Sequence, residues 1–336
     1  MKYFLTGATG FIGGRIARRL REQGHDVVAL VRDPSKASDL RTIGVDVRQG
    51  DVTDRESLRG PMTGVDGVFH VAGWFKFDDP DPSLGERVNV EGTRNVLEVM
   101  AELGIPKGVY TSSVVVNSDT GGKIVDETFR HGGPWMSEYE RTKWKAHYEV
   151  AEPMIRSGLP LVIVMPGTVY GPGDTSRIRP LFVRYLKGKL RAIPKGTAQS
   201  WSYVEDVAEG HILAMQRGMP GGTYILAGPA LTLVEAFETA ERITGVPAPR
   251  FHPSPRFLRA VAMITRSEWM RVAAGVTYLG SSEKAQKDLG FRSRSFETGL
   301  RETLTFEKAL LENSHQPGPP TFLPSRVAVP PVGPPL

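Results

Sequence analysis

Tyr139 and Lys143 lie four positions apart in the segment SEYERTKWK, so they would share one face of a helix. A tyrosine that exchanges a proton with a carbonyl or an alcohol must ionise well below its usual pKa of about 10. To lower the pKa to about 7, the phenolate must be stabilised by roughly 4 kcal/mol. An ammonium group ~4 Å away supplies about that free energy at an effective dielectric of about 20. The pair is therefore a candidate for acid–base chemistry on an oxygen atom.

The spacing alone does not identify a site, because Tyr185 and Lys189 repeat it. Tyr139 follows the hydroxyl pair Ser112–Ser113 by one loop, whereas Gly188 interrupts the second pair within a basic segment. A neighbouring Tyr–Lys pair on the protein surface is the alternative interpretation. The context favours Tyr139 as the reactive tyrosine.

A second candidate site lies at the start of the chain, in KYFLTGATGFIG. Gly7, Gly10 and Gly13 separate the strand-like run Tyr3–Leu5 from a helical pattern that begins at Ile16. Glycines at this spacing let the chain turn tightly and let backbone N–H groups approach a pyrophosphate at the positive end of the helix. The alternative is that they are ordinary turn glycines.

The next apolar run, Val27–Val31, completes a β-α-β pattern of about 30 residues and favours a dinucleotide site. Asp33, just after this run, could accept the ribose 2′-OH of NAD, whereas Arg32 and Lys36 suit the 2′-phosphate of NADP. Asp33 also precedes Pro34 and could simply cap the following helix. The sequence favours NADP, and NAD is the alternative.

These candidate sites require a scaffold that brings them together. Strand-like runs recur at Val45–Val47, Val65–Val71, Gly108–Thr111 and Leu161–Val164, with helical segments such as Thr93–Leu103 and Glu138–Ala151 between them. The alternation predicts an α/β fold with a doubly wound parallel sheet, whose site lies at the carboxyl ends of the strands. Candidate contacts just after strands are Asp51, Val52, Val71, Ala72, Gly73, Ser112 and Ser113. His70 is interpreted as a packed strand residue rather than a ligand.

Composition excludes several classes of function. The chain has 336 residues, a net charge of +5, no cysteine and seven scattered histidines. Without cysteines or close histidine pairs we expect no metal site, and because the cations are dispersed we expect no nucleic-acid partner. No apolar stretch is long enough for a membrane span and no signal-peptide pattern is present, so we expect a cytoplasmic location.

Several segments together resemble the extended short-chain dehydrogenase/reductase family, also called the NAD-dependent epimerase/dehydratase family. They are TGATGFIG, GDVTD, HVAG, NVEGTRN, YTSS, YERTK, PGTVYGPGD, YVEDVAEGH and SSEKAQKDLGF, and they carry the resemblance to about residue 311. VRDPSK and TSS look most like dihydroflavonol-4-reductase-type members, and the overall pattern is also similar to hopanoid-associated sugar epimerases.

The resemblance implies roles for the candidate residues. Tyr139 would be the general acid/base, Lys143 would lower its pKa and hold the nicotinamide ribose, and Ser113 would bind the substrate oxygen. With the candidates found above, the predicted cofactor contacts are Gly7, Thr9, Gly10, Phe11, Ile12, Gly13, Arg32, Lys36, Asp51, Val52, Val71, Ala72, Gly73, Tyr139, Lys143, Pro166 and Val169. A homodimer through Thr93–Leu103 and Glu138–Ala151 is also implied by the family.

The resemblance also implies a domain division. We expect a Rossmann domain over residues 1–170 with a returning segment near 201–230, and a smaller, discontinuous substrate-binding domain over 171–200 and 231–311. Val234–Thr244 and Glu297–Leu310 read as amphipathic helices of the smaller domain. The proline-rich segment 313–336 is predicted to be an extended tail without a catalytic role.

Features near the predicted cleft bear on the substrate. Nucleotide-sugar members of the family typically carry an arginine where this chain has Gln199, which argues against a nucleotide sugar. A run of cations could hold an anionic substrate or be a solvated surface: Arg177, Arg179, Arg184, Lys187, Lys189, Arg191 and Lys195. Four aromatic residues could form an apolar part of the cleft or pack within loops: Trp74, Phe75, Phe77 and Trp135.

The leading hypothesis is an NADP(H)-dependent oxidoreductase that reduces a carbonyl, or oxidises the alcohol, of a small and partly apolar molecule. The first alternative is an NAD-dependent sugar epimerase or dehydratase, in which the hydride returns to the same substrate. The second is a regulator that binds the dinucleotide without catalysis, which the presence of Ser113, Tyr139 and Lys143 disfavours.

Overall fold

The computed structural model describes residues 1–76, 79–81 and 83–313. Its main feature is a seven-stranded parallel sheet in the order β3-β2-β1-β4-β5-β6-β9. The strands are β1 (Lys2–Thr6), β2 (Asp26–Val31), β3 (Asp46–Gln49), β4 (Gly67–His70), β5 (Gly108–Thr111), β6 (Leu161–Pro166) and β9 (Thr223–Leu226). The predicted doubly wound α/β sheet is confirmed.

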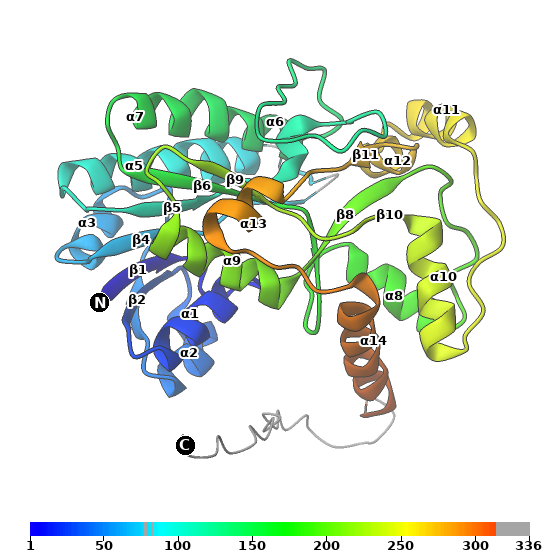
Figure 1. Cartoon of the computed structure of the whole chain (residues 1–336), viewed down its shortest axis with the longest axis horizontal. Helices are drawn as coiled ribbons and strands as arrows, with labels where there is room; N and C mark the ends of the chain where they lie inside the picture. Colours follow the sequence, from blue (N-terminus) through cyan, green and yellow to red (C-terminus); the bar gives the residue numbers. More distant parts are fainter. Residues whose placement is uncertain (77–78, 82, 314–336) are drawn as a thin grey trace.

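Helices cover both faces of this sheet (Figure 1). One core joins the sheet to α1 (Gly13–Glu22), α2 (Ser38–Thr42), α9 (Val204–Arg217) and α13 (Glu283–Leu289). The other core joins the sheet to α3 (Glu56–Met62), α5 (Gly92–Glu102), α6 (Glu138–Lys145) and α7 (Glu152–Arg156). The short α4 (Ser83–Gly85) precedes a π-helical turn, Glu86–Glu91, and this turn leads into α5. A second π-helical turn, Ala146–Ala151, connects α6 to α7.

The central strands are apolar on both sides because both faces of the sheet are covered. In β1, Phe4 belongs to one core while Tyr3 and Leu5 belong to the other. The side chains of β4 and β6 are likewise buried throughout. The continuous apolar runs of the sequence, rather than alternating ones, follow from this arrangement.

A smaller sheet and a third core lie beyond the carboxyl ends of the large sheet (Figure 1). Strand β8 (Ala198–Tyr203) pairs with β7 (Thr168–Tyr170), β10 (Ala230–Thr232) and β11 (Thr277–Tyr278). The helices of this part are α8 (Ile178–Leu186), α10 (Leu233–Thr244), α11 (Pro255–Thr265), α12 (Glu268–Ala273) and α14 (Phe296–Asn313). The amphipathic helices predicted at Val234–Thr244 and Glu297–Leu310 correspond to α10 and α14.

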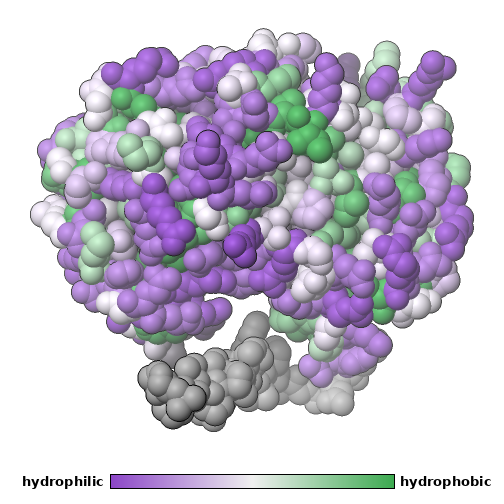
Figure 2. All heavy atoms as spheres, viewed as in Figure 1, coloured by the Kyte–Doolittle hydropathy of each residue, from purple (hydrophilic) through white to green (hydrophobic). Residues whose placement is uncertain are grey.

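The surface in the view of Figure 2 is mostly hydrophilic, with scattered apolar areas. Within the described residues, none of the helices is both long and apolar enough to cross a membrane. Apart from Asn313, which ends α14, the predicted proline-rich tail lies outside the described residues.

Three buried histidines brace the ends of the central strands. His70 contacts the hydroxyls of Thr6 at 2.9 Å and Thr93 at 3.0 Å, which confirms its interpretation as a packed strand residue. His211 Nδ1 lies 2.7 Å from the Val207 carbonyl, and its Nε2 lies 2.9 Å from the Thr111 hydroxyl. His147 Nδ1 contacts the Ser112 hydroxyl at 2.8 Å.

Burial lowers the pKa of His70 and His147 to about 3 and that of His211 to about 4. Each of these imidazoles is therefore neutral in the folded protein at neutral pH and takes up a proton only on unfolding. Since the unfolded state binds more protons below a pH of about 6.5, these groups make the protein less stable as the pH falls through that value.

We predict that His211→Gln reduces this pH dependence. Glutamine keeps a polar partner for Thr111 but does not titrate. Between a pH of about 5.5 and about 4.5, the free energy of unfolding should fall less steeply in the variant, by up to about 1.4 kcal/mol per pH unit. Urea unfolding across this range measures the slope, and His252→Gln, at a position that is not fully buried, serves as the control. Equal slopes in His211→Gln and the wild type would contradict the assignment.

Candidate active site

The glycine loop packs directly on the backbone that follows β4. Gly7 has a positive φ of 74°, and a Cβ there would lie 2.8 Å from the amide nitrogen of Ala72. A Cβ on Gly13 would lie 2.2 Å from the carbonyl oxygen of Gly7, and the amide of Gly10 donates to the same oxygen at 2.9 Å. Side chains at Gly7 and Gly13 would force the loop, β4 and α1 apart.

The start of α1 forms a cradle for an anion. The amides of Phe11 and Ile12 donate to no acceptor within the described residues, and the first turn of α1 contains no acidic residue. Thr9 and Gly10 are exposed in front of it. Free N–H groups at the positive end of a helix fit the diphosphate of a dinucleotide. Residues Gly7–Ile12 would hold that diphosphate.

Thr6 connects the glycine loop to the residues after β4. Its Oγ1 accepts the amides of Val71 and Ala72, each at 3.1 Å, so both of its lone pairs are used. The hydroxyl proton must then point to His70 Nδ1, 2.9 Å away, and we assign the Nε2–H tautomer to this imidazole. That N–H donates to Thr93 Oγ1 at 3.0 Å. Val71 to Gly73 are thereby fixed beside the cradle.

The structure brings Ser113 and Tyr139 together. Ser113 lies two residues after the end of β5 and caps a 3₁₀ turn, Val114–Asn117, while Tyr139 is the second residue of α6. The Ser113 hydroxyl is hydrogen-bonded to the Tyr139 phenol, which lowers the pKa of Tyr139, but the burial of the phenol raises that pKa by more. The net pKa of Tyr139 is above its usual value, so the phenol keeps its proton at neutral pH.

Lys143 is buried, with an exposed fraction of 4%. Its Nζ donates to the Thr111 carbonyl at 2.7 Å and lies 3.3 Å from the Tyr110 hydroxyl. Burial lowers the pKa of Lys143 to about 7. Burial is the largest influence on the pKa of both groups and opposes the charged form of each, so the role of Lys143 in lowering the pKa of Tyr139 stays a prediction.

The second Tyr–Lys pair does not form a site. Helix α8 ends at Leu186, and Gly188 follows with a φ of 65°, so Tyr185 and Lys189 do not share a helical face. The Tyr185 hydroxyl donates to the carbonyl of Val246 at 2.5 Å. This tyrosine is a buried structural residue.

At the end of β2, Asp33 acts as a cap. Its carboxylate accepts the amide of Ser35 at 3.0 Å and the Ser35 hydroxyl at 2.6 Å, and Lys36 Nζ lies 3.5 Å away. Arg32 is exposed and makes no ion pair with any described residue. The capping interpretation of Asp33 is confirmed, and Arg32 is the cation available at this strand end.

The remaining predicted contacts lie at the same edge of the sheet. Asp51 follows β3 and accepts the amide and hydroxyl of Thr53, each at 2.9 Å. Val52 is buried against Gly92, where a Cβ would approach it to 2.7 Å. Pro166 is the last residue of β6, and Val169 lies in β7. Their contact with a cofactor stays a prediction.

Sequence analysis missed a buried acid next to the reactive tyrosine. The Glu140 carboxylate accepts the Met136 amide and the Ser118 hydroxyl, each at 2.9 Å, and is hydrogen-bonded to the Tyr278 hydroxyl. Burial raises the pKa of Glu140. The only signal in the sequence was its position beside Tyr139 in YERTK, where a charged helical residue normally faces solvent.

The aromatic loop residues have different environments. Trp74 is buried, and its indole donates to Asp79 Oδ2 at 3.4 Å, so it packs within its loop. Trp135 lies edge-on to Trp144 with ring centroids 5.5 Å apart. Phe75 is 48% exposed, and Phe77 lies outside the described residues. In the 3₁₀ turn that Ser113 caps, both polar atoms of the buried Asn117 amide have no hydrogen-bond partner within the described part of the chain.

Two arginines near the cleft are held by distant acids. Arg15, in α1, contacts Glu205 at 2.7 Å and the carbonyl of Pro172 at 2.6 Å. Arg179, from the cationic run, contacts Glu307 at 2.7 Å. These guanidinium groups connect parts of the fold.

Gln199 lies in β8, where its amide oxygen accepts the Thr168 hydroxyl at 2.7 Å.

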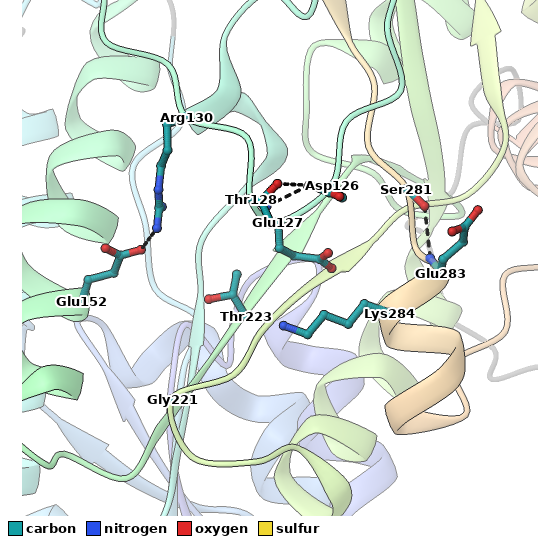
Figure 3. A pocket seen from close by; sticks show the side chains of 10 residues that line it. All are labelled: Asp126, Glu127, Thr128, Arg130, Glu152, Gly221, Thr223, Ser281, Glu283 and Lys284. Atoms are coloured by element: carbon teal, nitrogen blue, oxygen red, sulfur yellow. Dashed lines mark hydrogen bonds and ion pairs between the residues drawn. The ribbon is translucent and has the colours of Figure 1, made fainter.

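A separate surface hollow of about 430 Å³ lies beside the edge strand β9 (Figure 3). It is lined by charged residues that already have partners: Arg130 contacts Glu152 at 2.7 Å, and Glu127 accepts the amide of Ile225 at 2.8 Å. None of the candidate catalytic residues lines it. The hollow therefore has no part in the candidate active site.

Comparisons with known proteins agree with this geometry. The chain is 33% identical over 327 residues to a putative dihydroflavonol 4-reductase of Synechocystis sp., covering 90% of this chain and 93% of that protein. It is 31% identical to sterol demethylase protein B of Methylococcus capsulatus, covering 79% and 81% of the two chains. The crystal structure of gox2253 superposes with a TM-score of 0.81 at 31% identity, covering 92% and 98%.

A family model described as the NAD dependent epimerase/dehydratase family matches residues 3–227. The match spans the glycine cradle, the ends of the parallel strands, and Ser113, Tyr139 and Lys143. The chain therefore belongs to the NAD dependent epimerase/dehydratase family, whose members are NAD(P)-dependent enzymes of the extended short-chain dehydrogenase/reductase type.

Proposed function

We propose that the protein is an NADP(H)-dependent reductase of a ketone or aldehyde on a small, partly apolar molecule. The observation that carries the proposal is the protonated Tyr139 phenol hydrogen-bonded to Ser113 at the carboxyl end of β5. A phenol that keeps its proton at neutral pH is a proton donor, which the reduction of a carbonyl requires.

The residues divide the chemistry between them. The cofactor, when bound, supplies the hydride to the carbonyl carbon. The hydroxyls of Ser113 and Tyr139 would both bond to the carbonyl oxygen, and Tyr139 would donate its proton as negative charge develops there. Lys143, held by Thr111 and Tyr110, would present its ammonium group to the ribose of the nicotinamide. The cradle Gly7–Ile12 would fix the diphosphate.

Two other observations favour a reductase over an epimerase. Gln199 stands where nucleotide-sugar enzymes typically carry an arginine, and neither name of the two relatives refers to a nucleotide sugar.

The end of β2 supports NADP over NAD. Asp33 uses its carboxylate to cap the next turn, whereas Arg32 is exposed and without an ion pair in the described part of the chain. A planar guanidinium suits a phosphate because it can donate two parallel hydrogen bonds. Arg32 would therefore bind the 2′-phosphate, and Lys36 would contribute less because it already lies near Asp33.

The smaller sheet and its helices would form the substrate-binding part, over 171–200 and 231–311. The proposal extends to a homodimer through α5 and α6, which family membership supports. It also extends to a cytoplasmic location, which the dependence on NADP(H) supports.

We predict that Tyr139→Phe lowers kcat for carbonyl reduction by about 10²–10⁴-fold, because the proton donor is lost while the ring is kept. NADPH oxidation with a panel of aldehydes and ketones measures the rate, and cofactor fluorescence should show unchanged NADPH binding. Tyr185→Phe, in the second Tyr–Lys pair, is the matched control and should keep its kcat. Normal turnover by the Tyr139→Phe enzyme would refute the role of Tyr139 as proton donor. If the wild type retained NAD tightly and catalysed no net oxidation or reduction, the epimerase would be favoured.

We predict that Arg32→Ala weakens NADPH binding by roughly 10–100-fold and leaves NADH binding nearly unchanged, because only NADPH carries the 2′-phosphate. Titration of each cofactor into the two proteins measures the dissociation constants. Arg18→Ala, at an exposed position in α1, is the charge-matched control. An equal loss of affinity for both cofactors would rule out the phosphate contact.

A further inference from the structure

Helix α11 exposes apolar side chains that the rest of the fold does not cover. Within the described residues nine large apolar side chains are exposed, and four of them lie between residues 251 and 264. They are Phe251 at 64%, Phe257 at 58%, Met263 at 81% and Ile264 at 84% exposed. The opposite face of the helix, with Leu258 and Ala262, is buried. An α-helix that is apolar on both faces normally has a partner on both.

The exposed side of α11 has the pattern of an interfacial helix. At 3.6 residues per turn, Phe257, Ala260 and Ile264 fall within about 60° of one another on its outer side. Arg256 and Arg259 lie along one flank of this stripe, and Arg266 follows the helix. Apolar side chains beside arginines are typical of helices that lie in the headgroup layer of a membrane.

The charge of this segment selects the kind of partner. Between Arg250 and Arg271 there are five arginines and one acid, Glu268. Arg256, Arg259 and Arg266 are exposed and make no ion pair in the described part of the chain. A second copy docked on the same face would place like charges against each other, whereas an anionic surface would attract them.

We propose that α11 docks the protein on an anionic lipid bilayer, with Phe257 and Ile264 inserted among the headgroups and the three unpaired arginines on the phosphates. In this arrangement the protein lies on the membrane without spanning it. The proposal rests on the proposed function in one respect, since the bilayer would be the source of an apolar carbonyl substrate.

Helix α12 contacts both the docking helix and the start of α6. Helix α11 packs against α12, and both lie at the end of the molecule beyond α6 and β11 (Figure 1). In α12, the carboxylate of Glu268 accepts the amide of Glu138 at 2.9 Å, one residue before Tyr139. A substrate that leaves a bilayer beneath α11 would therefore reach the first turn of α6 past a single intervening helix.

The test is co-sedimentation of the full chain with vesicles. Wild-type protein is mixed with vesicles of phosphatidylcholine alone, or of phosphatidylcholine with phosphatidylglycerol, at low and high salt. We expect binding to the mixed vesicles that weakens at high salt, and little binding to phosphatidylcholine alone. Absence of binding to the mixed vesicles at low salt would overturn the proposal.

Two variants separate the apolar and electrostatic contributions. Phe257→Ser with Ile264→Ser should lower the partition coefficient on mixed vesicles at least about tenfold. Arg256→Gln with Arg259→Gln and Arg266→Gln should lower it on the order of 100-fold at low salt, because each arginine contributes about 1 kcal/mol near an anionic surface. Met219→Ser, which removes an exposed apolar side chain elsewhere, is the control.

Four outcomes of these experiments are decisive. Loss of vesicle binding in both variants, with unchanged circular dichroism, supports docking through α11. Wild-type binding by either variant overturns it. A change of the serine variant from dimer to monomer without vesicles also overturns it, because the face would then be an interface between copies. If no protein turns over any carbonyl but vesicle binding follows the expected pattern, the proposed function fails and the docking surface stands.

Discussion

The candidate site depends on the contact between the ends of β1 and β4. Thr6 accepts two amides from Val71 and Ala72, and Gly7 lies so close to Ala72 that a Cβ would not fit. Because hydrogen bonds and packing act on the same few backbone atoms, the anion cradle has one position relative to the fourth strand. If the two strand ends moved apart, the anion cradle would be distorted before the distant core was affected.

From Thr6 a chain of neutral hydrogen bonds reaches the lysine. The hydroxyl of Thr6 donates to His70, and His70 donates to Thr93, which leaves the proton of Thr93 for its hydrogen bond to Tyr110. Tyr110 then lies 3.3 Å from Lys143 Nζ. These contacts supply oxygen acceptors but no counter-charge, and a buried ammonium without an anion is unfavourable. This explains why the pKa of Lys143 falls to about 7, and it leaves the group suited to a polar ligand.

The sequence predicted the features that depend on local pattern. The glycine spacing, the apolar runs of the parallel strands and the context of Tyr139 are all readable over short windows, and each appears in the structure. The pKa of Tyr139 was not predictable, because spacing fixes the neighbours of a group but not the solvent it loses on folding. Long-range partners were equally hidden: Arg15 contacts Glu205, 190 residues away. Glu140 was missed because nothing in the helix pattern marks it as buried.

Carboxylates and a serine hold the first turn of α6 from three directions, and this fixes the reactive phenol. Ser137 accepts the amide of Glu140 at 3.2 Å, Glu268 accepts that of Glu138 at 2.9 Å, and the carboxylate of Glu140 accepts the amide of Met136. Amides at a helix start that would otherwise point to water are satisfied by the protein itself. Since Tyr139 lies among these residues, its ring is positioned before any substrate binds. Because α12 supplies one of these three acceptors and also packs against α11, a single helix links the proposed membrane-facing helix to the first turn that carries the proton donor.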